Sequence, residues 1–166
     1  PVADRAMLHA DNAYDLPHVK IISHRLKTNT QSATAFRGFG GPQGMFGIET
    51  VIEEIATTLG KDPVEIRLKN LYRDPSVSGD AQSMVTQYGQ TIEDFVADKV
   101  IDQLLHESKY CARRQEVAAF NANSRYRKRG LSLVPLKFGI SFTATMLNQG
   151  GALVNIYMDG SVVVNH

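Results

Sequence analysis

The fold is organised by the stretch Phe36-Arg37-Gly38-Phe39-Gly40-Gly41-Pro42-Gln43-Gly44, which runs directly into an amphipathic pattern. The apolar residues after it recur at i, i+3, i+4, i+7 and i+11, and they are Ile48, Val51, Ile52, Ile55 and Leu59. This spacing predicts a helix with one buried face. Gly60 is expected to end it, because glycine adopts the left-handed conformation that closes many helices.

Two interpretations of the glycine-rich stretch stay open on physical grounds. Its four glycines in nine residues allow close approach of the backbone to a ligand. The helix start beyond it would offer free N–H groups to an anion, such as a phosphate or the oxygens on a metal centre. A tight structural turn explains the glycines equally well. The stretch is not a P-loop, because no Gly-Lys-Ser/Thr follows, and Gln43 stands where a dinucleotide fingerprint needs its third glycine.

Further elements are expected on both sides of this helix. A second helix starts at Pro63, with Asp62 as its N-cap, and ends at Asp74-Pro75. The turn Asp159-Gly160 suits the positive φ angles of a two-residue hairpin loop. Periodicity predicts other helices at 4–13, 93–107 and 110–121, and strands at 19–27, 131–143, 152–158 and 161–165.

These elements predict an α+β fold in which a helical middle segment is flanked by β segments. Residues 1–166 form either a single domain or two lobes. In the second case, 1–129 is mostly helical with an N-terminal strand, and 130–166 is β. Both chain ends interrupt a pattern, so we expect an internal fragment of a larger protein.

Composition excludes several classes of function. A formal net charge of +1 gives no electrostatic basis for binding nucleic acid. No apolar stretch approaches the roughly 18 residues of a membrane span. Cys111 is the only cysteine, which excludes an intrachain disulfide and a thiolate metal cluster. The five histidines show no metal-ligand spacing, and a cytoplasmic protein fits this composition best.

Outside the glycine-rich stretch, two places carry residues of chemical interest. Gly139 interrupts an apolar run and indicates a bulge or a close backbone approach. Phe142 after it is either core or pocket wall, and its polar neighbour Thr143 could line a pocket. Arg5 lies on a short helical pattern, where a lone arginine is usually a surface residue.

Five motifs follow one another along the chain. They are Thr34-Ala35-Phe36-Arg37-Gly38-Phe39-Gly40-Gly41-Pro42-Gln43-Gly44, Asp62-Pro63-Val64-Glu65-Ile66-Arg67-Leu68-Lys69-Asn70-Leu71, Lys137-Phe138-Gly139-Ile140-Ser141-Phe142-Thr143, Leu147-Asn148-Gln149 and Asp159-Gly160-Ser161. Together they resemble the xanthine dehydrogenase and aldehyde oxidase family of molybdenum hydroxylases. The resemblance runs from about Arg5 to His166 and is weakest between about Asp74 and Gln90.

The resemblance implies roles for five residues. Arg5, in Asp4-Arg5-Ala6-Met7-Leu8-His9, matches a catalytic arginine that holds the purine and stabilises charge in the transition state. Arg37 falls where the loop places a backbone N–H against the molybdenum centre, which makes it the cofactor and metal contact. Phe39 matches a ring that stacks face-on against the purine, and Phe142 a ring that meets its edge. Thr143 matches a hydroxyl that hydrogen-bonds the substrate.

Arg5 favours one branch of this family, because aldehyde oxidases usually lack that arginine. The resemblance therefore implies hydroxylation of hypoxanthine and xanthine to urate, with an aldehyde or another N-heterocycle as the alternative substrate. A non-catalytic interaction module is the alternative of a different class. It is disfavoured because Arg5, Phe39 and Phe142 are all present.

The resemblance also implies what this chain lacks. The glutamate that serves as catalytic base belongs beyond His166, and a purine-contacting glutamate belongs before Pro1. The molybdenum–molybdopterin site here is therefore partial, and we expect the isolated chain to be inactive. Iron–sulfur clusters and FAD belong to other parts of the parent enzyme. The partners implied are the purine, the remaining molybdopterin region and the iron–sulfur and FAD domains or subunits, in an oligomeric parent without nucleic acid or membrane.

Overall fold

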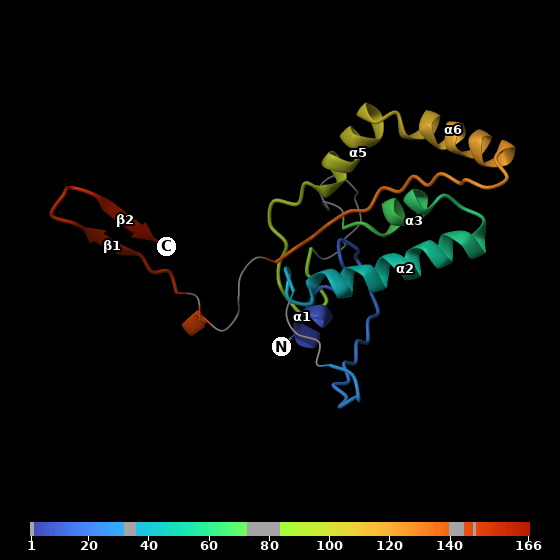
Figure 1. Cartoon of the computed structure of the whole chain (residues 1–166). Helices are drawn as coiled ribbons and strands as arrows, with labels where there is room; N and C mark the ends of the chain where they lie inside the picture. Colours follow the sequence, from blue (N-terminus) through green and yellow to red (C-terminus); the bar gives the residue numbers. More distant parts are fainter. Residues whose placement is uncertain (1, 32–35, 73–83, 140–144, 148) are drawn as a thin grey trace.

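The computed structural model describes residues 2–31, 36–72, 84–139, 145–147 and 149–166. Their helices are α1 (Val2–Leu8), α2 (Gly41–Leu59), α3 (Pro63–Asn70), α5 (Ala97–Glu107) and α6 (Tyr110–Asn123), with a short 3-10 helix at Thr145–Leu147. Strands β1 (Leu153–Ile156) and β2 (Val162–Asn165) form the sheet. Figure 1 shows the helices gathered in one body and the β hairpin lying apart from it. The predicted α+β class is confirmed.

The long helix α2 ends at Gly60, as the sequence predicts, but it begins at Gly41, inside the glycine-rich stretch and not after it. Its flanking residues Gly40 (φ 100°) and Gly60 (φ 64°) are both left-handed. The predicted buried stripe is confirmed in part, since Ile52 is buried together with Met45 and Ala56, and Ile48 packs against the core. The predicted residues Val51, Ile55 and Leu59 are 40–58% exposed. The core packs against the side of α2 that carries Ile52 and the small residue Ala56. Val51, Ile55 and Leu59 therefore face outward.

The Asp62 cap is confirmed, and it does more than start α3. Asp62 Oδ1 accepts from the Val64 N–H at 2.9 Å and from the Tyr110 hydroxyl at 3.0 Å. Its other oxygen pairs with Arg114 Nε at 2.9 Å. Burial, followed by this carboxylate, raises the pKa of Tyr110 to about 12. One side chain thus joins the start of α3 to α6.

Two predicted strands are absent from the described residues. Residues 19–27 and 131–139 carry no strand assignment, and the remainder of the second prediction, 140–143, lies outside the described part. A strand requires a hydrogen-bonded neighbour, and alternating side chains alone do not provide one. In 19–27 exposure still alternates, since Ile21 and Ser23 are half-buried and Ile22 is 61% exposed.

The C-terminal hairpin is confirmed. Strand β1 pairs antiparallel with β2, with Leu153 opposite Asn165 and Ile156 opposite Val162. Gly160 has a φ of 83°, and the Tyr157 N–H donates to the Ser161 carbonyl at 2.9 Å. The predicted two-residue turn is wrong in part, because Gly160 is left-handed and Asp159 is not. The Gly160 N–H donates to the Tyr157 carbonyl at 3.0 Å, and this longer loop, with glycine at its left-handed position, joins the strands.

An ion-pair network at the centre of the helical body joins α2 to α3. Arg67 is 2% exposed and donates to Glu49 at 2.8 Å and to Glu53 at 2.7 Å. Glu49 also accepts from the Tyr14 hydroxyl at 2.6 Å and from Asn12 at 2.8 Å. Burial, and then Glu49, raise the pKa of Tyr14. The turn at 12–14 is thereby fixed against both helices.

None of the described helices has both the length and the apolar character needed to cross a bilayer.

Candidate functional site

Helix α1 crosses the start of α2 at two glycines. A Cβ added to Gly40 would lie 2.0 Å from the Val2 carbonyl oxygen, and one added to Gly44 would lie 2.2 Å from the Ala6 carbonyl oxygen. Both contacts are with backbone, which cannot swing aside. Gly40 and Gly44 therefore allow α1 and α2 to pack closely. This packing places Arg5, on α1, near the glycine-rich loop.

We expect Gly44→Ala to destabilise the protein by about 1–3 kcal/mol, because the added methyl group overlaps the α1 backbone. Gly47→Ala on the same helix is the matched control. Its Cβ meets nothing within 4 Å, so higher helix propensity should stabilise the protein by about 0.5–1 kcal/mol. Thermal unfolding of the full-length protein measures both changes. Equal effects at the two positions would contradict the close-packing role of Gly44.

The loop before α2 holds an aromatic residue in an unusual backbone conformation. Gly38, Phe39 and Gly40 have φ angles of 93°, 51° and 100°. Glycine adopts such angles freely, but a bulky residue does so at a cost of about 1–3 kcal/mol. Strain of this kind is concentrated at functional sites, where it aims a side chain. It supports the prediction that Phe39 belongs to a site.

Arg5 lies where three segments meet. Its guanidinium donates to the Gly139 carbonyl, and its Cζ atom lies 5.1 Å from the centroid of the Phe138 ring. The same ring covers Gly41 so closely that a Cβ there would lie 2.5 Å from it. Arg5, on α1, is half-buried beside the glycine-rich loop and the segment at 137–139, and contacts outside its own helix hold its side chain.

The segment at 135–139 is tied to the turn after α1 by side chains. Asn12 donates to the Pro135 carbonyl at 2.9 Å and accepts from the Lys137 N–H at 3.2 Å. Lys137 Nζ pairs with buried Asp11 at 2.9 Å. These bonds occupy backbone groups that a strand partner would otherwise take, which explains why this segment is not a strand.

A cavity of about 550 Å³ adjoins this junction. Its walls include His9, Tyr88, Lys137, Phe138 and Gly139. His9, Lys137 and Phe138 were not among the candidate site residues named from the sequence. His9 could have been found, because a residue four positions after Arg5 lies on the same side of a helix.

Of the other four predicted site residues, the structure describes Arg37 and Phe39. Arg37 is exposed on the loop, beside a Phe36 ring that is 81% exposed. Phe39 is partly buried and lies just before Gly40, the N-cap of α2. Phe142 and Thr143 lie outside the described residues, so their proposed substrate contacts stay predictions.

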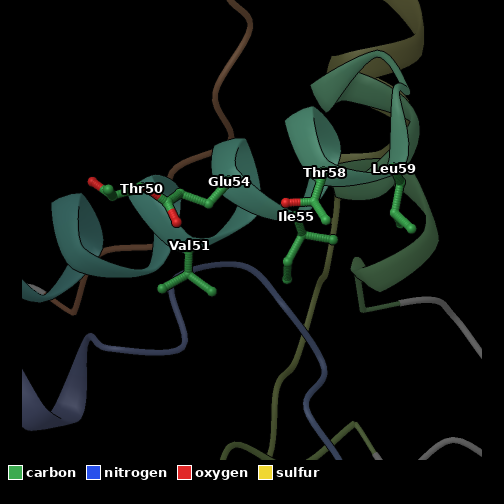
Figure 2. Close-up of a pocket in the computed structure, with 6 residues that line it drawn as sticks. All are labelled: Thr50, Val51, Glu54, Ile55, Thr58 and Leu59. Carbon is green, nitrogen blue, oxygen red and sulfur yellow. The ribbon is translucent and has the colours of Figure 1, made fainter.

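A second cavity, of about 570 Å³, lies on α2 and is unrelated to this junction. Thr50, Val51, Glu54, Ile55, Thr58 and Leu59 line it, and Figure 2 shows that all six belong to one helix. It is an open and mainly apolar helix face. Such a surface lacks the convergent polar groups of a substrate site.

The loop fits an anionic metal cofactor better than it fits a bare metal ion. Within the described ranges, no group of three or more His, Cys, Asp or Glu side chains is placed to hold a metal. Arg37 is exposed at the loop tip, where a cofactor from outside can reach its backbone and guanidinium. The helix start offers fewer donors than the sequence suggests, because Pro42 has no N–H and the Gly41 N–H bonds to Gly38.

Models of the molybdopterin cofactor-binding domain match this chain over residues 1–71 and again over residues 103–166. The chain belongs to the molybdopterin cofactor-binding domain family. The resemblance read from its motifs is therefore confirmed. The first match contains α1, the glycine-rich loop, α2 and α3, and the second contains the 135–139 segment.

Relatives of this molybdopterin-binding chain are xanthine dehydrogenases. It is 48% identical to xanthine dehydrogenase from Calliphora vicina and 46% identical to xanthine dehydrogenase/oxidase from Rattus norvegicus, each over 165 residues. These alignments cover 99% of this chain and 12% of each relative. The chain is thus similar to one region of these xanthine dehydrogenases and spans about an eighth of their length.

A solved structure supports the same fold. Aldehyde oxidoreductase from Desulfovibrio gigas matches with a TM-score of 0.58 and 32% sequence identity. The match covers 75% of this chain and 12% of that one. Much of the fold is therefore shared with a part of that aldehyde oxidoreductase.

Proposed function

We propose that the protein containing this chain hydroxylates hypoxanthine and xanthine to urate, as part of purine catabolism in the cytoplasm. The observation that carries the proposal is the position of Arg5, held by Gly139 and Phe138 beside the loop that bears Phe39. A guanidinium stays charged and offers a planar fork of donors to purine oxygens. The bound molybdenum cofactor supplies the redox chemistry, and the protein supplies position and charge.

The remaining site residues have separate tasks in this proposal. Arg37 presents its backbone N–H to the cofactor at the exposed loop tip. Phe39 stacks on the face of the purine, and Phe142 meets its edge. Thr143 donates a hydrogen bond that fixes orientation. A flat and weakly charged ring is well held between aromatic walls with a few polar groups.

The proposal places the rest of the reaction in other parts of the protein. The catalytic glutamate and a second purine-contacting glutamate would come from the remaining molybdopterin region. The iron–sulfur clusters and FAD would come from other domains or subunits of an oligomeric enzyme. The isolated chain, whether one domain or two lobes divided near residue 130, is expected to be inactive.

The test is the cofactor content and substrate range of the full-length protein. We expect bound molybdenum and pterin, with turnover of xanthine well above that of an aromatic aldehyde. Bound molybdenum with turnover of the aldehyde alone would contradict the purine proposal and favour an aldehyde oxidoreductase. Absence of molybdenum after expression in a cofactor-producing host would contradict both.

A further inference from the structure

The histidine that follows α1 is nearly enclosed and uses both ring nitrogens. His9 is 6% exposed. Its Nδ1 lies 3.0 Å from the Arg5 carbonyl oxygen, and its Nε2 lies 3.1 Å from the Gly139 nitrogen. A carbonyl can only accept and an amide N–H can only donate. The two contacts therefore define one tautomer, neutral, with the proton on Nδ1.

The His9 ring is also part of a stacked cluster that includes Arg5. The centroids of the His9 and Phe138 rings lie 4.9 Å apart, and the Arg5 guanidinium lies over the same Phe138 ring. Both backbone polar groups of Gly139 are hydrogen-bonded, since its N–H donates to His9 and its carbonyl accepts from Arg5. Arg5 and His9 thus bind the same residue from one end of one helix.

We propose that His9 is a positioning residue for Arg5, fixing the guanidinium through Gly139 and Phe138. This inference rests on the proposed function, in which Arg5 contacts the purine and His9 holds Arg5 in place. The Nδ1 bond holds the last turn of α1, which carries Arg5. The Nε2 bond holds the carbonyl-bearing residue to which Arg5 donates. A displaced catalytic group can cost about 100-fold in rate.

Two variants of the full-length holoenzyme separate the two bonds. In His9→Gln the amide oxygen can reach the place of Nε2 and accept from Gly139. In His9→Asn the shorter side chain can replace only the Nδ1 donor. We expect His9→Gln to retain most of the kcat for xanthine, and His9→Asn to lose about 10- to 100-fold at unchanged molybdenum content. Equal activities of the two variants would overturn the proposal.

A double-mutant cycle with Arg5→Met distinguishes positioning from general support of the fold. If His9 acts through Arg5, His9→Asn causes little further loss of kcat in the Arg5→Met background. An equal fold-loss in both backgrounds would mean that His9 acts independently of Arg5, and the proposal would be wrong.

Hydrogen exchange tests the contact without any substrate. The peptide that contains Gly139 should exchange faster in His9→Asn and at the wild-type rate in His9→Gln. Unchanged exchange in both variants would overturn the role of His9. Failure of the wild-type enzyme to convert xanthine would instead overturn the proposed function, and the exchange result would still stand for the contact.

Discussion

Arg5→Met is expected to lower kcat/KM for xanthine by about 10²–10³-fold in the full-length enzyme, the scale of a lost oxyanion donor. Methionine keeps much of the side-chain volume but has no charge and no N–H donors. The loss should fall mainly on kcat if the guanidinium stabilises charge that develops in the transition state. Steady-state kinetics, corrected for molybdenum content, measure the effect.

Two further variants serve as controls: Arg5→Lys tests the charge alone, and Arg113→Met removes an arginine elsewhere. Lysine keeps the positive charge without the planar fork, so we expect intermediate activity. Arg113 is exposed on α6, and its loss should leave turnover unchanged. Bound molybdenum with wild-type turnover in Arg5→Met would remove Arg5 from the mechanism. An aldehyde or another heterocycle would then be the better candidate substrate.

The parts of the fold that depend on local chemistry could be predicted from the sequence. Gly60 ends α2 and Gly160 turns the hairpin because their left-handed backbone favours glycine, and Asp62 caps α3 because its side chain accepts from the Val64 N–H. The motifs likewise predicted the family.

The predictions that failed depend on which segments become neighbours. Residues 131–139 alternate like a strand, yet Asn12 and His9 bind their backbone groups. Val51 and Ile55 have helical spacing, yet the packed side of α2 is the one with Ala56. Periodicity reports that an apolar stripe exists, and it does not report which neighbour covers it. The anion loop and the tight turn were competing interpretations, but Gly40 and Gly44 serve packing while Arg37 stays exposed.

Loss of Arg67 is expected to destabilise the protein strongly, because its side chain pairs with two glutamates in a buried network. Its two ion pairs differ in solvent screening, because the Glu49 side chain is 12% exposed and that of Glu53 is 45% exposed. An exposed pair contributes about 0–1 kcal/mol, whereas breaking a buried pair by removing one partner costs about 3–5 kcal/mol. Glu49 also receives bonds from Tyr14 and Asn12, so its charge stays in place when Arg67 is lost.

Arg67→Met should therefore destabilise the protein by about 3–5 kcal/mol, and Glu53→Gln by at most about 1 kcal/mol. Calorimetry of the full-length protein should show a lower Tm in the first variant only, for the transition that includes this region. Adding Glu49→Gln to Arg67→Met should recover part of the loss, because a neutral amide leaves no unpaired buried charge. If the double variant is as unstable as the two single losses added together, the cost lies in packing around Arg67, and the unpaired carboxylate is not its cause.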